Sequence, residues 1–213
     1  MKLCEKLVSY ELFGIIYVVI NMIKTNDIIQ EGNPILRKRS EEVALPLDDD
    51  DFKLLKDMRR YVIDSQDEEL VEKNNLKPSV GLAAPQVGVN KKMFAMHTMD
   101  EKGKHLHSYA VVNPKIIAET EAETYLPGGE GCLSVDEEKN GLVPRAKRIK
   151  ARVTLIDTDT GEPTTKTLRL SGYPGIVFQH EYDHLLGILF IDKKKPALPD
   201  TEPIEFNVPE QEL

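Results

Sequence analysis

Residues 180–184 read His180-Glu181-Tyr182-Asp183-His184, which places two histidines four positions apart. On a helix, side chains four residues apart lie on one face, so both imidazoles can reach a single metal ion. Glu181 would lie beside that metal without binding it, a position that suits a base acting on a metal-bound water. The pattern therefore predicts a metal site with hydrolytic chemistry.

A catalytic site of this kind uses three protein ligands and leaves the fourth position for water. Cys132 is the strongest candidate for the third ligand because it follows the glycine-rich stretch 128–131, where the backbone can approach a site closely. His105 and His107 are weaker candidates, since they lie in a polar segment that we expect to be a solvated loop. An inert buried cysteine is the alternative reading of Cys132.

Two amphipathic helices are predicted. Acidic residues at 48–51 suit an N-cap and the positive end of a helix dipole, and apolar residues at helical spacing extend that helix over 50–65. Pro174-Gly175 opens a second, apolar-faced helix over about 175–190, which carries the two histidines. The polar segment 66–79 is expected to be loop-like or weakly helical.

Short alternating or β-branched runs predict strands in the rest of the chain. Strands are expected at 92–97 and 108–113, and a β-hairpin at 149–155 and 165–170 around the turn at Asp159-Thr160-Gly161. A run of strands followed by one long helix indicates an α+β fold with antiparallel strands.

No linker or repeat divides the chain, so we expect a single catalytic domain over 22–196 and an acidic tail over 197–213, as a surface strand or loose end. Residues 1–21 form an extension of doubtful status. Their apolar run at 12–20 is shorter than the roughly 20 residues that a spanning helix needs. They are either upstream sequence read in frame before Met22 or a genuine extension that touches a membrane.

Composition limits the function classes. The 213 residues carry 28 Lys and Arg against 36 Asp and Glu, a net charge of −8, which argues against a surface that wraps nucleic acid. Two cysteines, Cys4 and Cys132, do not make a disulfide scaffold. These counts favour an acidic, soluble protein of the cytoplasm.

Three segments resemble, in order and spacing, the signature motifs of the peptide deformylase family: GLAAPQ at 81–86, EGCLS at 130–134 and QHEYDH at 179–184. The resemblance runs from about Ile28 to Asp192. It implies removal of the N-formyl group from the initiator methionine of new bacterial or organellar polypeptides, with release of formate. It also implies an α+β fold in which antiparallel strands surround a central helix bearing the two histidines.

The resemblance implies one divalent metal ion held by Cys132, His180 and His184, with water as the fourth ligand. The family typically works with Fe(II), and Zn, Ni or Co can often replace it. A bound metal lowers the pKa of its water towards about 7, so hydroxide is available near neutral pH. Glu181 would take the water proton and later deliver it to the leaving amine.

Two further residues are implied to stabilise the negative oxygen that forms on the attacked carbonyl. These are the side-chain amide of Gln86 and the backbone N–H of Leu133. The family pairs the substrate backbone with the strand before the catalytic glutamine, here around Val80 and Gly81.

An apolar pocket would take the methionine side chain. Ile176 and Val177, one turn before His180, project towards that side of the helix, although both could equally be plain core residues.

Two features depart from the family pattern. The first motif usually has a glycine where this chain has Ser79, which puts the geometry of the substrate strand in question. The length of 66–79 and the tail without a final helix resemble the longer Gram-positive subtype, whereas Val87-Gly88 resembles the shorter one. We expect the longer subtype.

The implied partners are N-formyl-methionyl nascent peptides, met near the ribosome exit by a monomer. No specific nucleic-acid binding and no firm membrane partner are expected. Two alternatives stay open: a metallopeptidase of the His-Glu-x-x-His type, although no histidine follows His184, and a non-catalytic protein with a structural Cys/His metal site. A structural site would need a fourth protein ligand.

Overall fold

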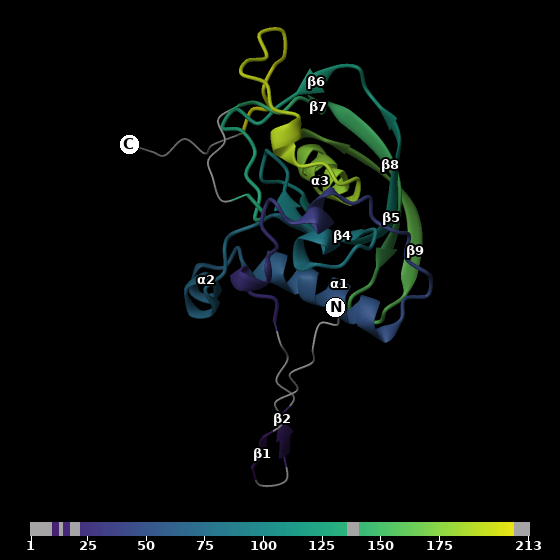
Figure 1. Ribbon diagram of the computed structural model, residues 1–213. Helices are drawn as coiled ribbons and strands as arrows, with labels where there is room; N and C mark the ends of the chain where they lie inside the picture. The colour runs from purple at the N-terminus through teal and green to yellow at the C-terminus, as the bar shows by residue number, and fades with distance from the viewer. Residues whose placement is uncertain (1–9, 13–14, 18–21, 136–140, 207–213) are drawn as a thin grey trace.

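The computed structural model describes residues 10–12, 15–17, 22–135 and 141–206 (Figure 1). Its centre is a five-stranded antiparallel sheet in the order β3-β4-β5-β8-β9. The strands are β3 (Gly81–Ala83), β4 (Met93–Met99), β5 (Leu106–Glu119), β8 (Arg148–Ile156) and β9 (Pro163–Ser171). The α+β class expected from the sequence is confirmed.

Two helices cover opposite faces of this sheet, with β4 between them (Figure 1). Met93 and Ala95 of β4 belong to the apolar cluster that contains the buried face of α1 (Asp49–Asp64). The alternate residues, Phe94 and Met96, pack in the cluster of α3 (Gly172–Leu185). Successive residues of a strand point to opposite faces, so β4 is buried on both sides and fixes α3 against the middle of the sheet.

The start of α1 agrees with the sequence. The Asp48 side chain accepts a hydrogen bond from the Asp51 N–H, and acidic residues fill the first turn. The following segment forms the seven-residue helix α2 (Glu68–Asn74), which ends at Asn75 in the left-handed conformation. The expectation of weak helix over 66–79 therefore holds for the middle of that segment.

The helix that carries the two histidines ends five residues earlier than predicted, at Leu185. Gly187 adopts φ +74°, and a β-carbon there would lie 2.5 Å from the Arg37 carbonyl oxygen. The chain therefore turns sharply at Gly187, where it packs against the backbone of Arg37. The next regular element in the described residues is a short 3₁₀ turn, η4 (Phe190–Asp192). Beyond the end of the helix, Leu189, Phe190 and Ile191 belong to a separate small apolar core.

The predicted hairpin of β8 and β9 is confirmed, with Arg148 opposite Ser171 and Ile156 opposite Pro163. Strand β5 is longer than the predicted 108–113 and contains two register shifts against β8. The expectation of a loop at His107 is wrong, because this residue pairs with Thr98 inside the sheet. His107 is a polar residue on a half-buried part of β5, and the sequence alone does not distinguish such a position from a loop.

The remaining described elements are short. Two two-stranded sheets are formed by β1 (Tyr10–Leu12) with β2 (Ile15–Tyr17) and by β6 (Glu123–Thr124) with β7 (Arg145–Ala146), and three more 3₁₀ turns are η1 (Thr25–Asp27), η2 (Pro34–Arg37) and η3 (Ala84–Val87). In the tail, Ile204 is buried and donates its N–H to the Tyr125 carbonyl. Within the described residues, no helix is long and apolar enough to cross a membrane.

The predicted extension over 1–21 lies mostly outside the described residues, and so does the last part of the tail, 207–213. The division into an extension, a domain over 22–196 and a tail stays a prediction.

Candidate active site

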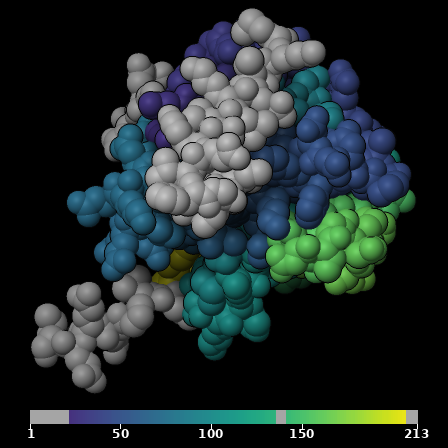
Figure 2. All heavy atoms as spheres, turned by 90° about the horizontal axis from the view of Figure 1, so that it is seen from below, coloured from purple at the N-terminus to yellow at the C-terminus, as the bar shows by residue number. Residues whose placement is uncertain are grey.

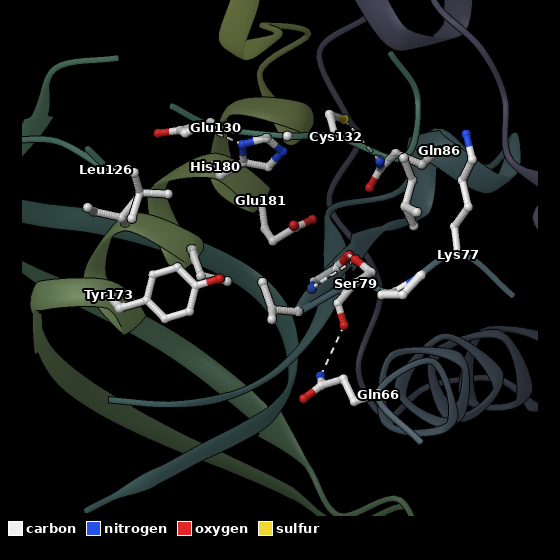
Figure 3. Close-up of a pocket in the computed structure, with 17 residues that line it drawn as sticks. Gln66, Lys77, Ser79, Gln86, Leu126, Glu130, Cys132, Tyr173, His180 and Glu181 are labelled. Atoms are coloured by element: carbon white, nitrogen blue, oxygen red, sulfur yellow. Dashed lines mark hydrogen bonds and ion pairs between the residues drawn. The ribbon is translucent and has the colours of Figure 1, made fainter. Parts of the chain in front are cut away.

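Helix α3 and the loop after β6 bring together the three predicted metal ligands. His180 and His184 lie one turn apart on α3, with ring centroids 5.0 Å from each other. Cys132 approaches His180 from the loop (Figure 3), and its Sγ lies 3.4 Å from Nε2 of His184. One donor atom from each of the three residues falls within 4.8 Å of the other two.

The surroundings of this cluster fit a divalent cation. His180 makes a 2.8 Å hydrogen bond through Nδ1 to Glu130 Oε2, which leaves Nε2 free to bind a metal. Burial alone would lower the pKa of His180, but its contacts with Cys132 and Glu130 raise the pKa well above 6.5. The electrostatic surroundings of His180 therefore favour a positive charge, as a bound cation would supply. A thiolate and two imidazoles suit Zn or Fe(II) and disfavour Mg or Ca.

Glu130 is held by a buried cation that the sequence motifs do not identify as functional. Arg145, 2% exposed, donates from Nε and Nη2 to both Glu130 carboxylate oxygens, and from Nη1 to Asp183. Burial would raise the pKa of Glu130, yet the hydrogen bonds from Arg145 and His180 lower it to about 2. The acceptor of the His180 hydrogen bond is thus a permanent carboxylate.

Asp183 completes this network from within α3, and Lys193 donates to it at 2.7 Å. In the sequence, nothing around Arg145 indicates that its charge is buried. The pairing depends on contacts between residues 15 and 38 positions apart.

Glu181 lies beside the three ligands with one oxygen unused. Its Oε2 is buried and has no hydrogen-bond partner among the described residues. Burial, the largest effect, raises the pKa of Glu181 from 4.5 to about 7. A carboxyl group with a pKa near neutrality can both accept and return a proton.

The Gln86 side chain is fixed with its NH₂ group towards the cluster. Its Oε1 accepts the Ala83 N–H at 2.8 Å, and its Nε2 donates to Ser134 Oγ at 3.2 Å. The same Nε2 lies 3.5 Å from Cys132 Sγ. Because the oxygen is occupied by the backbone, the amide presents a donor to the site.

A cavity of about 520 Å³ opens onto these groups (Figure 3). The four predicted substrate-binding residues all line this cavity: Val80, Gly81, Ile176 and Val177. Leu133 lines it as well. Ile176 and Val177 are 1% and 4% exposed, so they pack in the core and also form the apolar wall. The sequence did not point to several other lining residues, among them Gln66, Leu126 and Tyr173, which come from separate parts of the chain.

Ser79 occupies the position at which the sequence departs from the family pattern. Its Oγ donates to the Gly81 carbonyl at 2.6 Å and accepts the Gly81 N–H at 3.3 Å. Its backbone N–H donates to Ser65 Oγ, and its carbonyl accepts from Gln66 Nε2 (Figure 3). The Ser79 hydroxyl thus fixes the backbone at the start of β3, and Ser79 itself lines the cavity.

Comparison with known proteins identifies the relatives of this chain. The family model for polypeptide deformylase matches residues 25–199. The chain is 51% identical over 189 residues to a peptide deformylase 2 of Bacillus cereus, covering 86% of this chain and 100% of that protein. It is 50% identical over 172 residues to a peptide deformylase of Shouchella clausii, covering 81% and 91%.

Solved structures agree. The peptide deformylase of Thermotoga maritima superposes with a TM-score of 0.58 and 36% identity, covering 79% of this chain and 97% of that one. A probable peptide deformylase from Synechococcus phage S-SSM7 gives a TM-score of 0.60 and 35% identity, covering 78% and 97%.

The fold and the site thus define a metal-dependent hydrolase. The chain belongs to the polypeptide deformylase family. Its activity is the removal of the formyl group from an N-terminal formyl-methionine, and neither the metallopeptidase nor the structural-site alternative is favoured.

Proposed function

We propose that Cys132, His180 and His184 hold the catalytic metal ion of this deformylase and that Glu181 moves the protons of the reaction. The observation that carries the proposal is the donor cluster within 4.8 Å, with the unpaired Glu181 carboxylate beside it. We propose Fe(II) as the native metal, with Zn, Ni or Co as substitutes, because a thiolate with two imidazoles suits these ions. When bound, the metal supplies a water of lowered pKa and polarises the formyl oxygen.

Glu181 accepts the proton of the attacking water and later delivers it to the nitrogen of the leaving amine. In the metal-free protein, burial raises the pKa of Glu181 to about 7, so this carboxyl group is able to hold a proton and to release it near neutral pH. The products are formate and a peptide with a free amino terminus.

Gln86 and Leu133 stabilise the oxygen that becomes negative during attack. The Gln86 amide is already oriented by Ala83 and Ser134, so its N–H needs no reorganisation when charge develops. We assign the backbone N–H of Leu133 as the second donor. An amide adds a donor here without a charge that would compete with the metal.

The substrate peptide pairs with β3, in our proposal, through Val80 and Gly81. Strand β3 is an edge of the five-stranded sheet, and its first residue, Gly81, lines the cavity together with the preceding Val80, so an extended peptide can add to this edge as a further strand. The methionine side chain then lies against the apolar wall of Ile176 and Val177. A glycine at 81 lets the peptide and Glu181 approach the same point of the backbone.

We further propose that the chain acts as a cytoplasmic monomer on nascent peptides near the ribosome exit, without a membrane partner. The single catalytic domain extends over 22–196. The longer Gram-positive-like subtype is supported by the similarity to Bacillus relatives and by the lack of an α-helix in the described residues 186–206.

Formate release from a formyl-methionyl tripeptide, with the enzyme loaded anaerobically with Fe(II), tests the site assignment. Cys132→Ala and His184→Ala should each lose both metal and turnover, whereas the exposed control Glu162→Gln should keep both. Full metal occupancy in Cys132→Ala would exclude Cys132 as a ligand. Cleavage of a peptide bond in place of formate release would favour the metallopeptidase.

A further inference from the structure

We propose that one open face of the sheet binds the phosphate backbone of RNA, independently of sequence. This basic face is defined by five cationic side chains on neighbouring strands: Lys115 of β5, Arg148, Lys150 and Arg152 of β8, and Arg169 of β9. It lies apart from the catalytic cavity, and none of its residues lines that cavity.

The strand register places these side chains on the same side of the sheet. Residues 148, 150 and 152 alternate along β8, so they share a face, at a spacing of about 6.6 Å. Lys115 is the direct partner of Arg152, and Arg169 is the direct partner of Lys150. The intervening Ile149, Ala151 and Val153 point the other way, into the cluster that contains α3.

Two of these cross-strand pairs oppose like charges. Lys115 faces Arg152, and Lys150 faces Arg169, although such pairs destabilise a sheet. The repulsion is the more unusual because the whole chain carries a net charge of −8. A local cost of this kind in an acidic protein points to a bound polyanion that relieves it.

The five cations of the basic face form no ion pair with an acidic side chain in the part of the chain that the structure describes, whereas Arg37, Lys53, Arg60, Lys91 and Lys193 each have a carboxylate partner. Arg148, Arg152, Arg169 and Lys115 are exposed and Lys150 is half-buried. Their charges are therefore available to an external anion.

The end of the face nearest residues 118–120 is hollowed. A depression of about 280 Å³ is lined by the cations Arg148, Lys150 and Arg169, the hydroxyl-bearing residues Thr120 and Ser171, and one carboxylate, Glu119, which makes no ion pair with these cations among the described residues. Guanidinium, ammonium and hydroxyl groups are the usual donors to phosphate oxygens.

The chemistry of the face favours RNA over a lipid surface. A membrane-binding face combines basic residues with a broad apolar side, but Ile117 is the one exposed large apolar residue in the strand stretches that form this face. Newly made polypeptides emerge from a particle whose surface is rich in RNA, so the choice of RNA rests on the proposed function. The net charge of −8, which argues against a nucleic-acid surface, conceals this segregation of charge.

The test measures binding of the full, metal-loaded chain to a fluorescent RNA duplex of arbitrary sequence between about 50 and 200 mM salt. Five phosphate contacts predict a slope of log K against log salt of about −4.5. The double variant Arg152→Glu/Arg169→Glu should weaken binding about tenfold or more and reduce the slope by about 2 or more. Each glutamate would face a lysine across the strands, so the melting temperature should not fall.

The matched control is Lys24→Glu/Lys73→Glu, which makes the same change in net charge at exposed positions beside and on α2. Strands β8 and β9 lie on the opposite side of the molecule from α2 in Figure 1, and Figure 2 shows the turn that joins these two strands on the side away from α2 as well. The control should keep most of the RNA affinity. Equal loss in both variants would show that net charge, and not this face, determines binding, and would overturn the proposal.

Two further outcomes contradict the proposal. One is native RNA affinity in Arg152→Glu/Arg169→Glu, with Arg152→Gln/Arg169→Gln as a milder variant if the first does not fold. The other is binding to vesicles of anionic lipid with none to RNA. Formate release should be unchanged in all these variants, so failure of RNA binding leaves the deformylase assignment intact.

Discussion

The carboxylate of Glu181 lies against the α-carbon of Gly81. A β-carbon built on Gly81 would fall 2.2 Å from Glu181 Oε1 and 2.6 Å from its carboxyl carbon. Only glycine fits this contact, and φ at Gly81 is not in the left-handed region, so the reason is space and not backbone conformation. The edge strand of the sheet thus sets the position of the carboxylate that we propose as the proton carrier.

Gly81→Ala should therefore displace Glu181 and lower kcat. A displacement of about 1 Å at a reacting group can cost about 10²-fold in rate. The measurement is steady-state formate release. Gly128→Ala is the matched control, because nothing lies within 4 Å of a β-carbon there, and its kcat should stay near that of the native enzyme. A native kcat in Gly81→Ala would show that Glu181 does not need this position.

The raised pKa of Glu181 predicts a pH-dependent stability in the metal-free protein. The folded state binds this proton more tightly than the unfolded state, so the free energy of unfolding falls as pH rises from 4.5 to about 7. The full effect is about 3 kcal/mol at most. His184, whose pKa burial lowers well below 6.5, contributes in the opposite sense over an overlapping range.

The difference between native protein and Glu181→Gln isolates the Glu181 contribution. Denaturant unfolding in the presence of a chelator should show the stability of the variant rising relative to the native chain between about pH 4.5 and 7. A difference that does not change with pH would contradict the buried, partly protonated carboxyl group.

Glu130→Gln should weaken metal binding without removing a ligand. The substitution leaves Arg145 buried with a poorer partner, and it replaces the carboxylate that orients His180. Loss of such a partner typically costs about 10–100-fold in metal affinity. Competition with a chromophoric chelator measures it, and the exposed Glu119→Gln should bind metal as the native chain does. Equal affinities in both variants would exclude Glu130 as a positioning residue.

Glu101 caps the helix that carries the ligands, although it lies in the turn between β4 and β5. The Tyr173 N–H donates to Glu101 Oε2 at 3.2 Å, and the N-cap residue Ser171 makes no side-chain cap hydrogen bond. Glu101→Ala should lower the free energy of unfolding by about 1 kcal/mol. Chemical denaturation measures this, with the exposed turn residue Glu162→Ala as control. No difference between the two would exclude the cap.

The sequence predicts the parts of this molecule that local spacing controls. The i, i+4 histidines, the acidic start of α1 and the alternating hairpin of β8 and β9 each depend on residues close in the chain, and all three are confirmed. The α+β class follows from the order of these elements. The convergence of Cys132 with the two histidines was predicted from a combination of residue chemistry and family resemblance, since no local rule joins positions 132 and 180.

Long-range contacts explain what the sequence does not predict. The early end of α3 depends on the Arg37 backbone packed at Gly187, and the charge on Glu130 depends on the hydrogen bonds that Arg145 and His180 make to it. The basic face is likewise invisible in the composition, because its cations come from three strands and only their register brings them together. Burial and register are properties of the assembled sheet.

Glu181→Gln tests the central claim most directly when metal content and formate release are measured on the same Fe(II)-loaded sample. We predict full metal occupancy, because the glutamine removes none of the three ligands, together with a loss of turnover of about 10²–10⁴-fold. Turnover near the native rate with metal bound would contradict the assignment of Glu181 as the group that moves the protons.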